Sequence, residues 1–263
     1  MWLPANLNIF TGTTSRTRSN RFMELDLLRG FAIIFMIFLH IIWDLDYFGI
    51  MPINTAVYKF QKIVPAMFFV LVGMCLIVSR NRQINKPSFD EKKYDKHLLL
   101  RGLKILSLGM VITLITMIFL PDKPIFFGVL HCIGLSIIFS IPFLKLKSYN
   151  LLFGALIIIT GLIINLFPVE DPTILHLAIG FHQSDVAQYT IDYFPLLPWF
   201  GISLVGIAFG NILYRDNERR FKMPDLSRYK PAKIFSWLGQ HSLAIYLVHQ
   251  PIIAGALTVF LFL

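Results

Sequence analysis

Long apolar runs alternate with short charged segments along almost the whole chain. Seven of these runs are near or above the ~17 residues that a helix needs to cross the hydrocarbon layer of a membrane. They lie at residues 27–43, 56–79, 98–120, 125–144, 151–167, 193–214 and 234–263. The pattern predicts an all-α membrane protein, folded as a single bundle of about seven transmembrane helices.

Residues 1–20 differ from the rest, because they are rich in Thr, Ser and Asn and show no helical period. We expect them to form a mobile cytoplasmic tail. The sequence that follows contains no linker that would separate two domains. Residues 21–263 are therefore predicted to form one transmembrane domain.

The basic residues define a predicted orientation. Of the 24 Lys and Arg residues, all but Lys59, Lys62 and Lys123 lie near the beginning of the first, third, fifth and seventh runs or in the segments before them. Segments rich in Lys and Arg stay on the cytoplasmic side of a membrane. The sequence therefore predicts a cytoplasmic N-terminus and an external C-terminus.

Composition supports the membrane assignment. Hydrophobic residues make up 56% of the chain and charged residues only 15%, which is too little polar surface for a soluble domain. Topology accounts for the net charge of +9, with attraction to anionic membrane lipids as a further effect, so no nucleic-acid partner is expected. Cys75 and Cys132 lie inside apolar runs and suggest no disulfide framework.

Three ionisable residues lie on one predicted helix face, namely Arg29 and His40 within the first run and Asp44 directly after it. Arg29 and His40 are separated by close to three turns of roughly 3.6 residues, or ~16 Å of helix. Ionisable residues inside membrane helices are costly and mark functional sites by default. The alternatives are a His satisfied by a neighbouring helix, and an Arg that only orients the first helix.

Further polar side chains lie in later runs. The last run carries His241, Ser242, Tyr246, His249 and Gln250. Each polar residue taken alone is explained by a hydrogen bond between packed helices. Together, His40, His131 and His249 point to a reaction or a proton relay within the membrane. Because these histidines lie on three different runs without close ligand pairing, no metal site is expected.

The two predicted ends of the bundle differ in charge. Four basic residues can gather around a phosphorylated ligand or serve only to orient the chain: Arg29, Arg80, Arg101 and Lys104. The loop at 168–192 contains no Lys or Arg and ends at Asp192, next to Tyr193. An acidic loop of this kind either caps a site and attracts a cationic acceptor such as an amine, or is simply solvated.

Four segments carry a family resemblance: ELDLLRGFAIIFMIFLHIIWDLDYFG, FFGVLHCIGLS, DYFPLLPWFG and GQHSLAIYLVHQP. In this order they resemble the heparan-α-glucosaminide N-acetyltransferase catalytic-domain family in its compact prokaryotic form, within the transmembrane acyltransferase superfamily. The resemblance implies an enzyme that moves an acetyl or other acyl group from cytoplasmic acyl-CoA to an acceptor, often a sugar, across the membrane. It also implies a multi-pass protein of a prokaryotic plasma membrane, and it leaves a homodimer open.

The residue pattern and the resemblance together suggest one mechanism. The phosphates of acetyl-CoA would bind Arg29 and nearby basic residues, while His40 acts as general base or attacks the thioester. Asp44 would orient the His40 ring. His131 and His249 would polarise the thioester carbonyl or bind the acceptor. The candidate acceptor contacts are Asp192, Tyr193 and His241.

Another class of function remains open. A proton-coupled small-molecule transporter would use the histidines as a proton relay, although the sequence shows no inverted repeat. A seven-helix light receptor is disfavoured, because the last run has no Lys for a retinal Schiff base. Acetyl-CoA turnover separates an acyltransferase from either alternative.

Overall fold

The computed structural model describes residues 22–52, 61–215 and 218–262. The predicted tail at 1–20 lies outside these ranges. The long helices are α1 (Met23–Tyr47), α3 (Ile63–Ile84), α4 (Glu91–Phe119), α5 (Val129–Phe143), α6 (Asn150–Ile164), α8 (Leu196–Leu213) and α10 (Ser242–Phe262). The shorter elements are α7 (Ile174–Ile179), α9 (Lys230–Gln240), the 3-10 turns η1 (Lys147–Tyr149), η2 (Val186–Gln188) and η3 (Leu226–Arg228), and the strands β1 (Tyr214–Arg215) and β2 (Glu218–Arg219).

The helices confirm the prediction of an all-α membrane protein. In the described part of the chain, six helices are long and apolar enough to cross a membrane, and α5 is a shorter apolar helix of 15 residues. At about 1.5 Å per residue, α5 is ~22 Å long, less than the ~30 Å thickness of a hydrocarbon core. The fourth predicted run began at Ile125, but the chain is still extended at Gly128, so this helix starts later.

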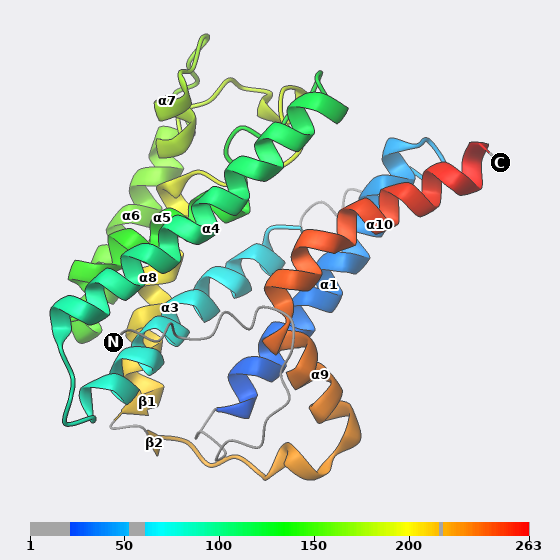
Figure 1. The fold of residues 1–263 in the computed structure, drawn as a ribbon. Helices are drawn as coiled ribbons and strands as arrows, with labels where there is room; N and C mark the ends of the chain where they lie inside the picture. Colours follow the sequence, from blue (N-terminus) through cyan, green and yellow to red (C-terminus); the bar gives the residue numbers. More distant parts are fainter. Residues whose placement is uncertain (1–21, 53–60, 216–217, 263) are drawn as a thin grey trace, which may run out of the picture.

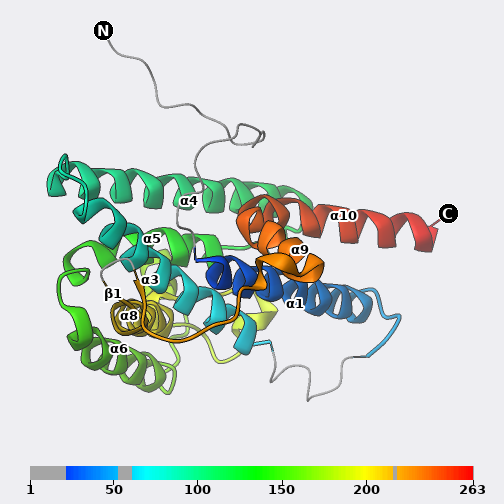
Figure 2. The ribbon, with the colours of Figure 1, turned by 90° about the horizontal axis from the view of Figure 1, so that it is seen from below.

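Helices that are distant in sequence pack side by side (Figure 1). α3 runs along α8, α6 covers another side of α8, and α4 packs on α5. α1, α9 and α10 form a second group, which joins the first where α1 meets α3. Figure 2 shows α1 and α10 extending together beyond the other helices. The interior between α3, α5 and α8 is filled by buried apolar side chains such as Leu76, Ile137 and Leu204.

The last predicted run, 234–263, contains two helices in its described part. The chain forms α9, breaks at His241 and continues as α10. Three consecutive polar residues, Gln240, His241 and Ser242, mark the break. The Gln240 side chain donates a hydrogen bond to Asp26 Oδ2 at 3.2 Å, so the end of α9 is bound to the beginning of α1. α10 then runs parallel to α1 toward the predicted external side.

Glycine allows the closest helix contact, as expected for a membrane bundle. Gly206 of α8 lies directly against the backbone of Val70 in α3, and Gly73 of α3 lies against the backbone of Ser203 in α8. Gly206 and Gly73 thus bring the two helices into direct backbone contact. Because no side chain separates the two backbones, α3 and α8 form a rigid centre that positions the helices around them.

Replacing Gly206 with Leu should disrupt this contact, because a Cβ atom here would overlap the Val70 carbonyl group. Overpacking of this kind costs about 1–3 kcal/mol, so the melting temperature of the detergent-solubilised protein should fall. Gly255→Leu in α10 is the matched control, since a Cβ atom there has nothing within 4 Å. Equal melting temperatures for Gly206→Leu and Gly255→Leu would contradict this packing.

Candidate active site

Two histidines from opposite ends of the sequence meet between α1 and α10. The ring centroids of His40 and His249 are 4.7 Å apart in an edge-to-face arrangement. His249 is buried and His40 is half-buried. The parallel course of α1 and α10 brings the rings together, because both side chains lie near the middle of their helices. The structure thus brings together two of the three histidines singled out from the sequence.

Hydrogen bonding defines the proton position on His249. Its Nδ1 lies 2.6 Å from the Tyr246 carbonyl oxygen. A carbonyl oxygen only accepts, so Nδ1 of the neutral ring carries the proton and Nε2 keeps a lone pair. The Nε2 atom is buried and has no hydrogen-bond partner in the described part of the chain. His249 therefore presents an unused basic nitrogen beside His40.

Asp44 and Gln250 lie next to the histidine pair. Gln250 Nε2 donates a hydrogen bond of 2.7 Å to Asp44 Oδ1, and the Asp44 side chain is almost fully buried. The predicted role of Asp44 was to orient His40, but its hydrogen bond goes to α10 instead. Asp44 Oδ2 and Gln250 Oε1 are buried without a partner among the described residues.

The histidine pair is surrounded by unsatisfied polar atoms. Asp44 Oδ2, His249 Nε2 and Gln250 Oε1 account for three of the five buried side-chain atoms without a partner in the described ranges. Leaving such an atom unpaired costs about 1–3 kcal/mol. Unpaired polar groups in a native protein call for an explanation, such as a role in catalysis. Their concentration at one contact between two helices indicates a site for a polar ligand.

Arg29 and Arg101 form a second charged cluster, nearer the basic end of the bundle. Arg29 Nη1 donates to Asp26 Oδ1 at 3.1 Å, and Arg29 Nη2 lies against Cys75 Sγ in α3. Arg101 of α4 is within electrostatic range of both Arg29 and Cys75. No ion pair of Arg101 with a carboxylate is present among the described residues. Two guanidinium groups within electrostatic range of each other favour an anion beside them.

The other two basic residues suggested for the donor behave differently. Arg80 donates a 3.0 Å hydrogen bond to Glu91 and lines a pocket on another face of α3. Lys104 is exposed on α4, three residues after Arg101. Arg29 and Arg101 thus lie within electrostatic range of each other, whereas the Arg80 side chain binds Glu91.

His131 holds two helices together. Its Nδ1 accepts a hydrogen bond of 3.2 Å from the Gly128 backbone N–H at the start of α5. Its Nε2 lies 3.4 Å from Thr113 Oγ1 in α4, and the hydroxyl of Thr113 donates to the Ile125 carbonyl oxygen. Both ring nitrogens are used and the side chain is buried. The structure does not join His131 to the His40–His249 pair.

Asp192 lies at the beginning of α5. Its Oδ2 accepts a hydrogen bond of 3.1 Å from the Val129 backbone N–H, where the helix dipole favours negative charge. Burial nevertheless raises the pKa of the Asp192 carboxyl to about 6. Asp192 is also within electrostatic range of Tyr246 in α10. It therefore faces the helix that carries His249.

The two remaining candidates are used elsewhere. The Tyr193 hydroxyl donates a 2.8 Å hydrogen bond to the Leu177 carbonyl oxygen and so anchors α7. His241 is exposed at the break between α9 and α10, and its Nδ1 donates to the Trp237 carbonyl oxygen at 2.8 Å. His241 directly follows Gln240, whose side chain binds Asp26 near the beginning of α1.

Two residues without a predicted role belong to the site. Gln250 binds Asp44, and Tyr246 lies between His249 and Asp192, with its ring centroid 5.5 Å from that of His249. The available signal was that both are polar residues in an apolar run, close to His249 in sequence. Pairing Gln250 with Asp44 required the relative position of α1 and α10, which the sequence pattern does not provide.

Comparison with known proteins identifies the family. The family model described as "Heparan-alpha-glucosaminide N-acetyltransferase, catalytic" matches residues 21–251. No curated protein and no solved structure gives a match. The matched range extends from the beginning of α1 into α10 and contains both histidines of the pair, Asp44 and the Arg29–Arg101 cluster. The chain belongs to the heparan-α-glucosaminide N-acetyltransferase catalytic-domain family of membrane acetyltransferases.

Proposed function

We propose that this protein transfers an acetyl group from acetyl-CoA at the basic end of the bundle to an amine or hydroxyl group of an acceptor, such as a sugar, from the opposite side. The observation that carries the proposal is the His40–His249 pair, with its unpartnered His249 Nε2. Membership of an acetyltransferase family supports the reaction class. His40 lies on α1 between Arg29 and the end of that helix that is predicted to be external.

The donor would enter at Arg29 and Arg101. Two guanidinium groups suit the phosphates of coenzyme A, because Arg forms charge-assisted, bidentate hydrogen bonds with phosphate. From Arg29 to His40 the helix rises ~16 Å, and the pantetheine arm would follow this face of α1. The thioester would then lie beside the histidine pair, away from bulk water.

The pair would carry out the proton transfer. His40 removes the proton from the acceptor amine or hydroxyl, whose lone pair attacks the thioester carbonyl carbon. The carbon–sulfur bond breaks, and the coenzyme A thiolate leaves and takes up the proton from the imidazolium. A second route to the same products begins with attack of His40 on the thioester, forming an acetyl-imidazole that the acceptor then cleaves.

His249 would assist His40. Its Nε2 lone pair accepts an N–H group, from His40 or from the acceptor, and so fixes the orientation of that group. Two imidazoles at this separation disfavour a second positive charge, so the pair would hold one extra proton at a time. Asp44, one turn beyond His40 on α1, would stabilise that charge, and Gln250 keeps its carboxylate in position.

Asp192 would contact the acceptor together with Tyr246. An ionised carboxylate attracts an amine, and both residues lie near the helix that carries His249. Tyr193 and His241 are left out of this proposal, because their polar groups bind the Leu177 and Trp237 carbonyl groups. His131 is left out as well, because both of its ring nitrogens are used by Gly128 and Thr113.

Single substitutions of His40 and His249 by Gln should abolish turnover without unfolding the protein. General acid–base catalysis contributes typically 10²–10⁴-fold, so the release of coenzyme A from acetyl-CoA should fall by about that factor in each variant. His97→Gln on α4 is the matched control, since His97 is exposed and lies near the basic end of that helix. Near-normal turnover in both variants would rule out the pair. If the wild type released no coenzyme A at all, proton-coupled transport would become the leading function.

Arg101→Gln should weaken the binding of acetyl-CoA. Hydrogen bonds to charged groups contribute about 1.5–3 kcal/mol, so the dissociation constant measured by calorimetry should rise about tenfold or more. Lys96→Gln controls for net charge, because Lys96 is an exposed cation on the same helix. An equal loss in both variants would mean that only general charge attracts the donor.

Asp192→Asn should change the pH dependence of stability. The folded protein holds the Asp192 proton up to about pH 6, compared with an ordinary pKa of 3.8. Its stability contribution therefore declines as pH rises from about 4 to 6, because the unfolded chain binds fewer protons there. Asn removes this decline and still accepts the Val129 N–H bond.

The measurement is the melting temperature of the wild type and Asp192→Asn between pH 4 and pH 8. The variant should gain relative to the wild type up to about pH 6 and stay level above it. A constant difference over the whole range would show that Asp192 titrates as an ordinary carboxyl group and is ionised throughout.

A further inference from the structure

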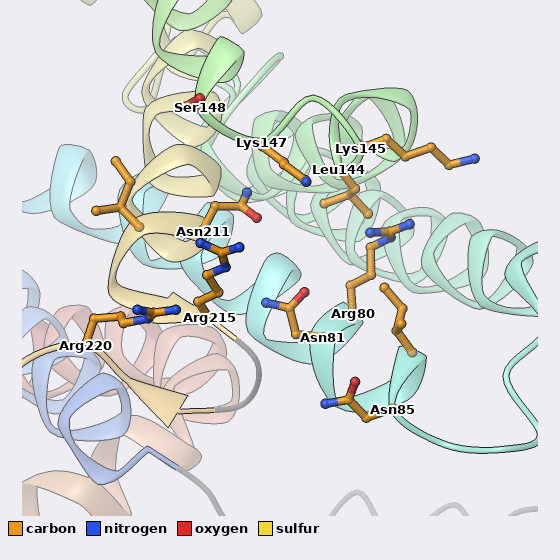
Figure 3. A pocket seen from close by; sticks show the side chains of 12 residues that line it. Arg80, Asn81, Asn85, Leu144, Lys145, Lys147, Ser148, Asn211, Arg215 and Arg220 are labelled. Carbon is orange, nitrogen blue, oxygen red and sulfur yellow. The ribbon is translucent and has the colours of Figure 1, made fainter.

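A basic pocket opens at the same end of the bundle as the predicted cytoplasmic segments (Figure 3). It lies between the end of α3, the connection from α5 to η1, and the junction of α8 with β1. The cavity has a volume of about 660 Å³. Its lining is formed by Arg80, Asn81, Ile84, Asn85, Leu144, Lys145, Lys147, Ser148, Asn211, Ile212, Arg215 and Arg220.

The charge of the lining has one sign. Five of the lining residues are Arg or Lys, and no Asp or Glu from the described part of the chain lines the cavity. Glu91, outside the lining, makes ion pairs of 3.0 Å with Arg80 and Lys145. This pairing fixes the position of the Arg80 side chain at the cavity wall. A group of cations from three separate segments attracts a multivalent anion to the cavity between them.

Lys147 is the member whose backbone is specifically held. Its backbone φ angle is +47°, in the left-handed region that residues other than glycine rarely adopt. The Asn150 side chain fixes this turn by donating 2.9 Å hydrogen bonds to the carbonyl oxygens of Lys147 and Phe143. In Figure 3 the Lys147 side chain points between Arg80 and Arg215, whereas Lys145 points away. Residues kept in such conformations cluster at functional sites.

The pocket also has an apolar edge. Ile84 and Ile212 belong to its lining and are exposed by 39% and 49%. They lie at the ends of two membrane-spanning helices, α3 and α8. The cavity therefore joins a cationic interior to exposed apolar side chains at the ends of two helices. Basic pockets between transmembrane helices on the cytoplasmic side are suited to phospholipid head groups.

This pocket is separate from the cluster that we assign to the donor. Arg29 lies against Cys75, and Ile84 follows Cys75 by nine residues, which is two and a half turns at roughly 3.6 residues per turn. Ile84 and Cys75 therefore lie on opposite faces of α3. The Ile84 wall of the pocket therefore lies away from the face of α3 that carries Cys75 and contacts Arg29.

We infer that the pocket around Lys147 and Arg215 is a second anion site, which binds phosphate groups independently of acetyl-CoA. The phosphate would come from the head group of an anionic phospholipid or from a soluble polyphosphate. In either case the bound phosphate would contact cations from α3, from the α5–η1 connection and from β1 at the same time. Bound ligand would thereby stabilise the basic end of the bundle. This inference goes beyond the proposed function and does not depend on it.

The test compares ligand stabilisation of the wild type with that of variants in the pocket. Lys147→Gly removes the charge and suits the left-handed backbone, so the variant should fold at least as well as the wild type. Arg215→Gln is a second, independent variant, and Lys147→Arg restores the charge. Lys96→Gln is the matched control, an exposed cation at the basic end of α4 and outside the lining. Melting temperatures are measured in phosphatidylcholine nanodiscs, with phosphatidylglycerol added to the bilayer or ATP added to the buffer.

We expect one of the two ligands to raise the melting temperature of the wild type, of Lys147→Arg and of Lys96→Gln. Lys147→Gly and Arg215→Gln should lose at least half of that rise. A rise with phosphatidylglycerol assigns the site to lipid, and a rise with ATP assigns it to a soluble polyphosphate. No rise with either ligand, or a rise that the two pocket variants retain in full, would overturn the inference.

A separate measurement distinguishes this site from the donor site. Calorimetry with coenzyme A should give the same dissociation constant for Lys147→Gly and the wild type, whereas Arg101→Gln should bind more weakly. If Lys147→Gly weakened coenzyme A binding as strongly as Arg101→Gln, the pocket would be part of the donor site and the inference of a second site would fail. If only the Arg101→Gln result failed, the donor assignment alone would be wrong.

Discussion

The hydrogen bond between Asp44 and Gln250 joins two helices that otherwise present mostly apolar side chains. Water is scarce within a membrane, so a buried carboxylate and amide must find partners inside the protein. Gln250 donates to Asp44 at 2.7 Å, and this contact sets the height of α10 relative to α1. The same register brings His249 against His40. The proposed chemistry therefore depends on the Asp44–Gln250 contact, whose two side chains have few other hydrogen-bond partners available.

The break at His241 contributes to the same arrangement. A straight helix over the last apolar run could not both bind Asp26 through Gln240 and align His249 with His40. α9 packs across the beginning of α1, and α10 then follows α1 in parallel (Figure 2). Arg29 and His40, one member of each proposed cluster, lie on the same helix, α1. The distance between them is fixed by the rise of that helix.

Much of the fold could be predicted from the sequence, because each apolar run is long enough to identify a membrane helix by itself. The late start of α5 and the break at His241 could not be predicted, since both depend on how local backbone groups are satisfied. For the site, the spacing of Arg29, His40 and Asp44 on one helix was sufficient to single them out. The sequence did not identify their partners on other helices, because a run of apolar residues gives no information about which helix lies beside it.

His131 illustrates the limit of such reasoning. A buried histidine in a membrane helix suggests chemistry, yet its two nitrogens bind Gly128 and Thr113 and hold α5 against α4. Arg80 shows the same limit for charge. It belongs to the same basic segment of the sequence as Arg82 and Arg101, but its side chain lines the basic pocket. Arg29 and Arg80, both among the basic residues suggested for the donor, thus have different neighbours: Cys75 and Asp26 for Arg29, and Glu91 for Arg80.

The most direct test of the central claim is a calorimetric titration of the purified wild-type protein in nanodiscs with acetyl-CoA. The account predicts saturable binding of one acetyl-CoA per chain, followed by slow heat from turnover when the histidine pair is intact. A folded protein that binds no acetyl-CoA would contradict the account, whatever the arrangement of its histidines.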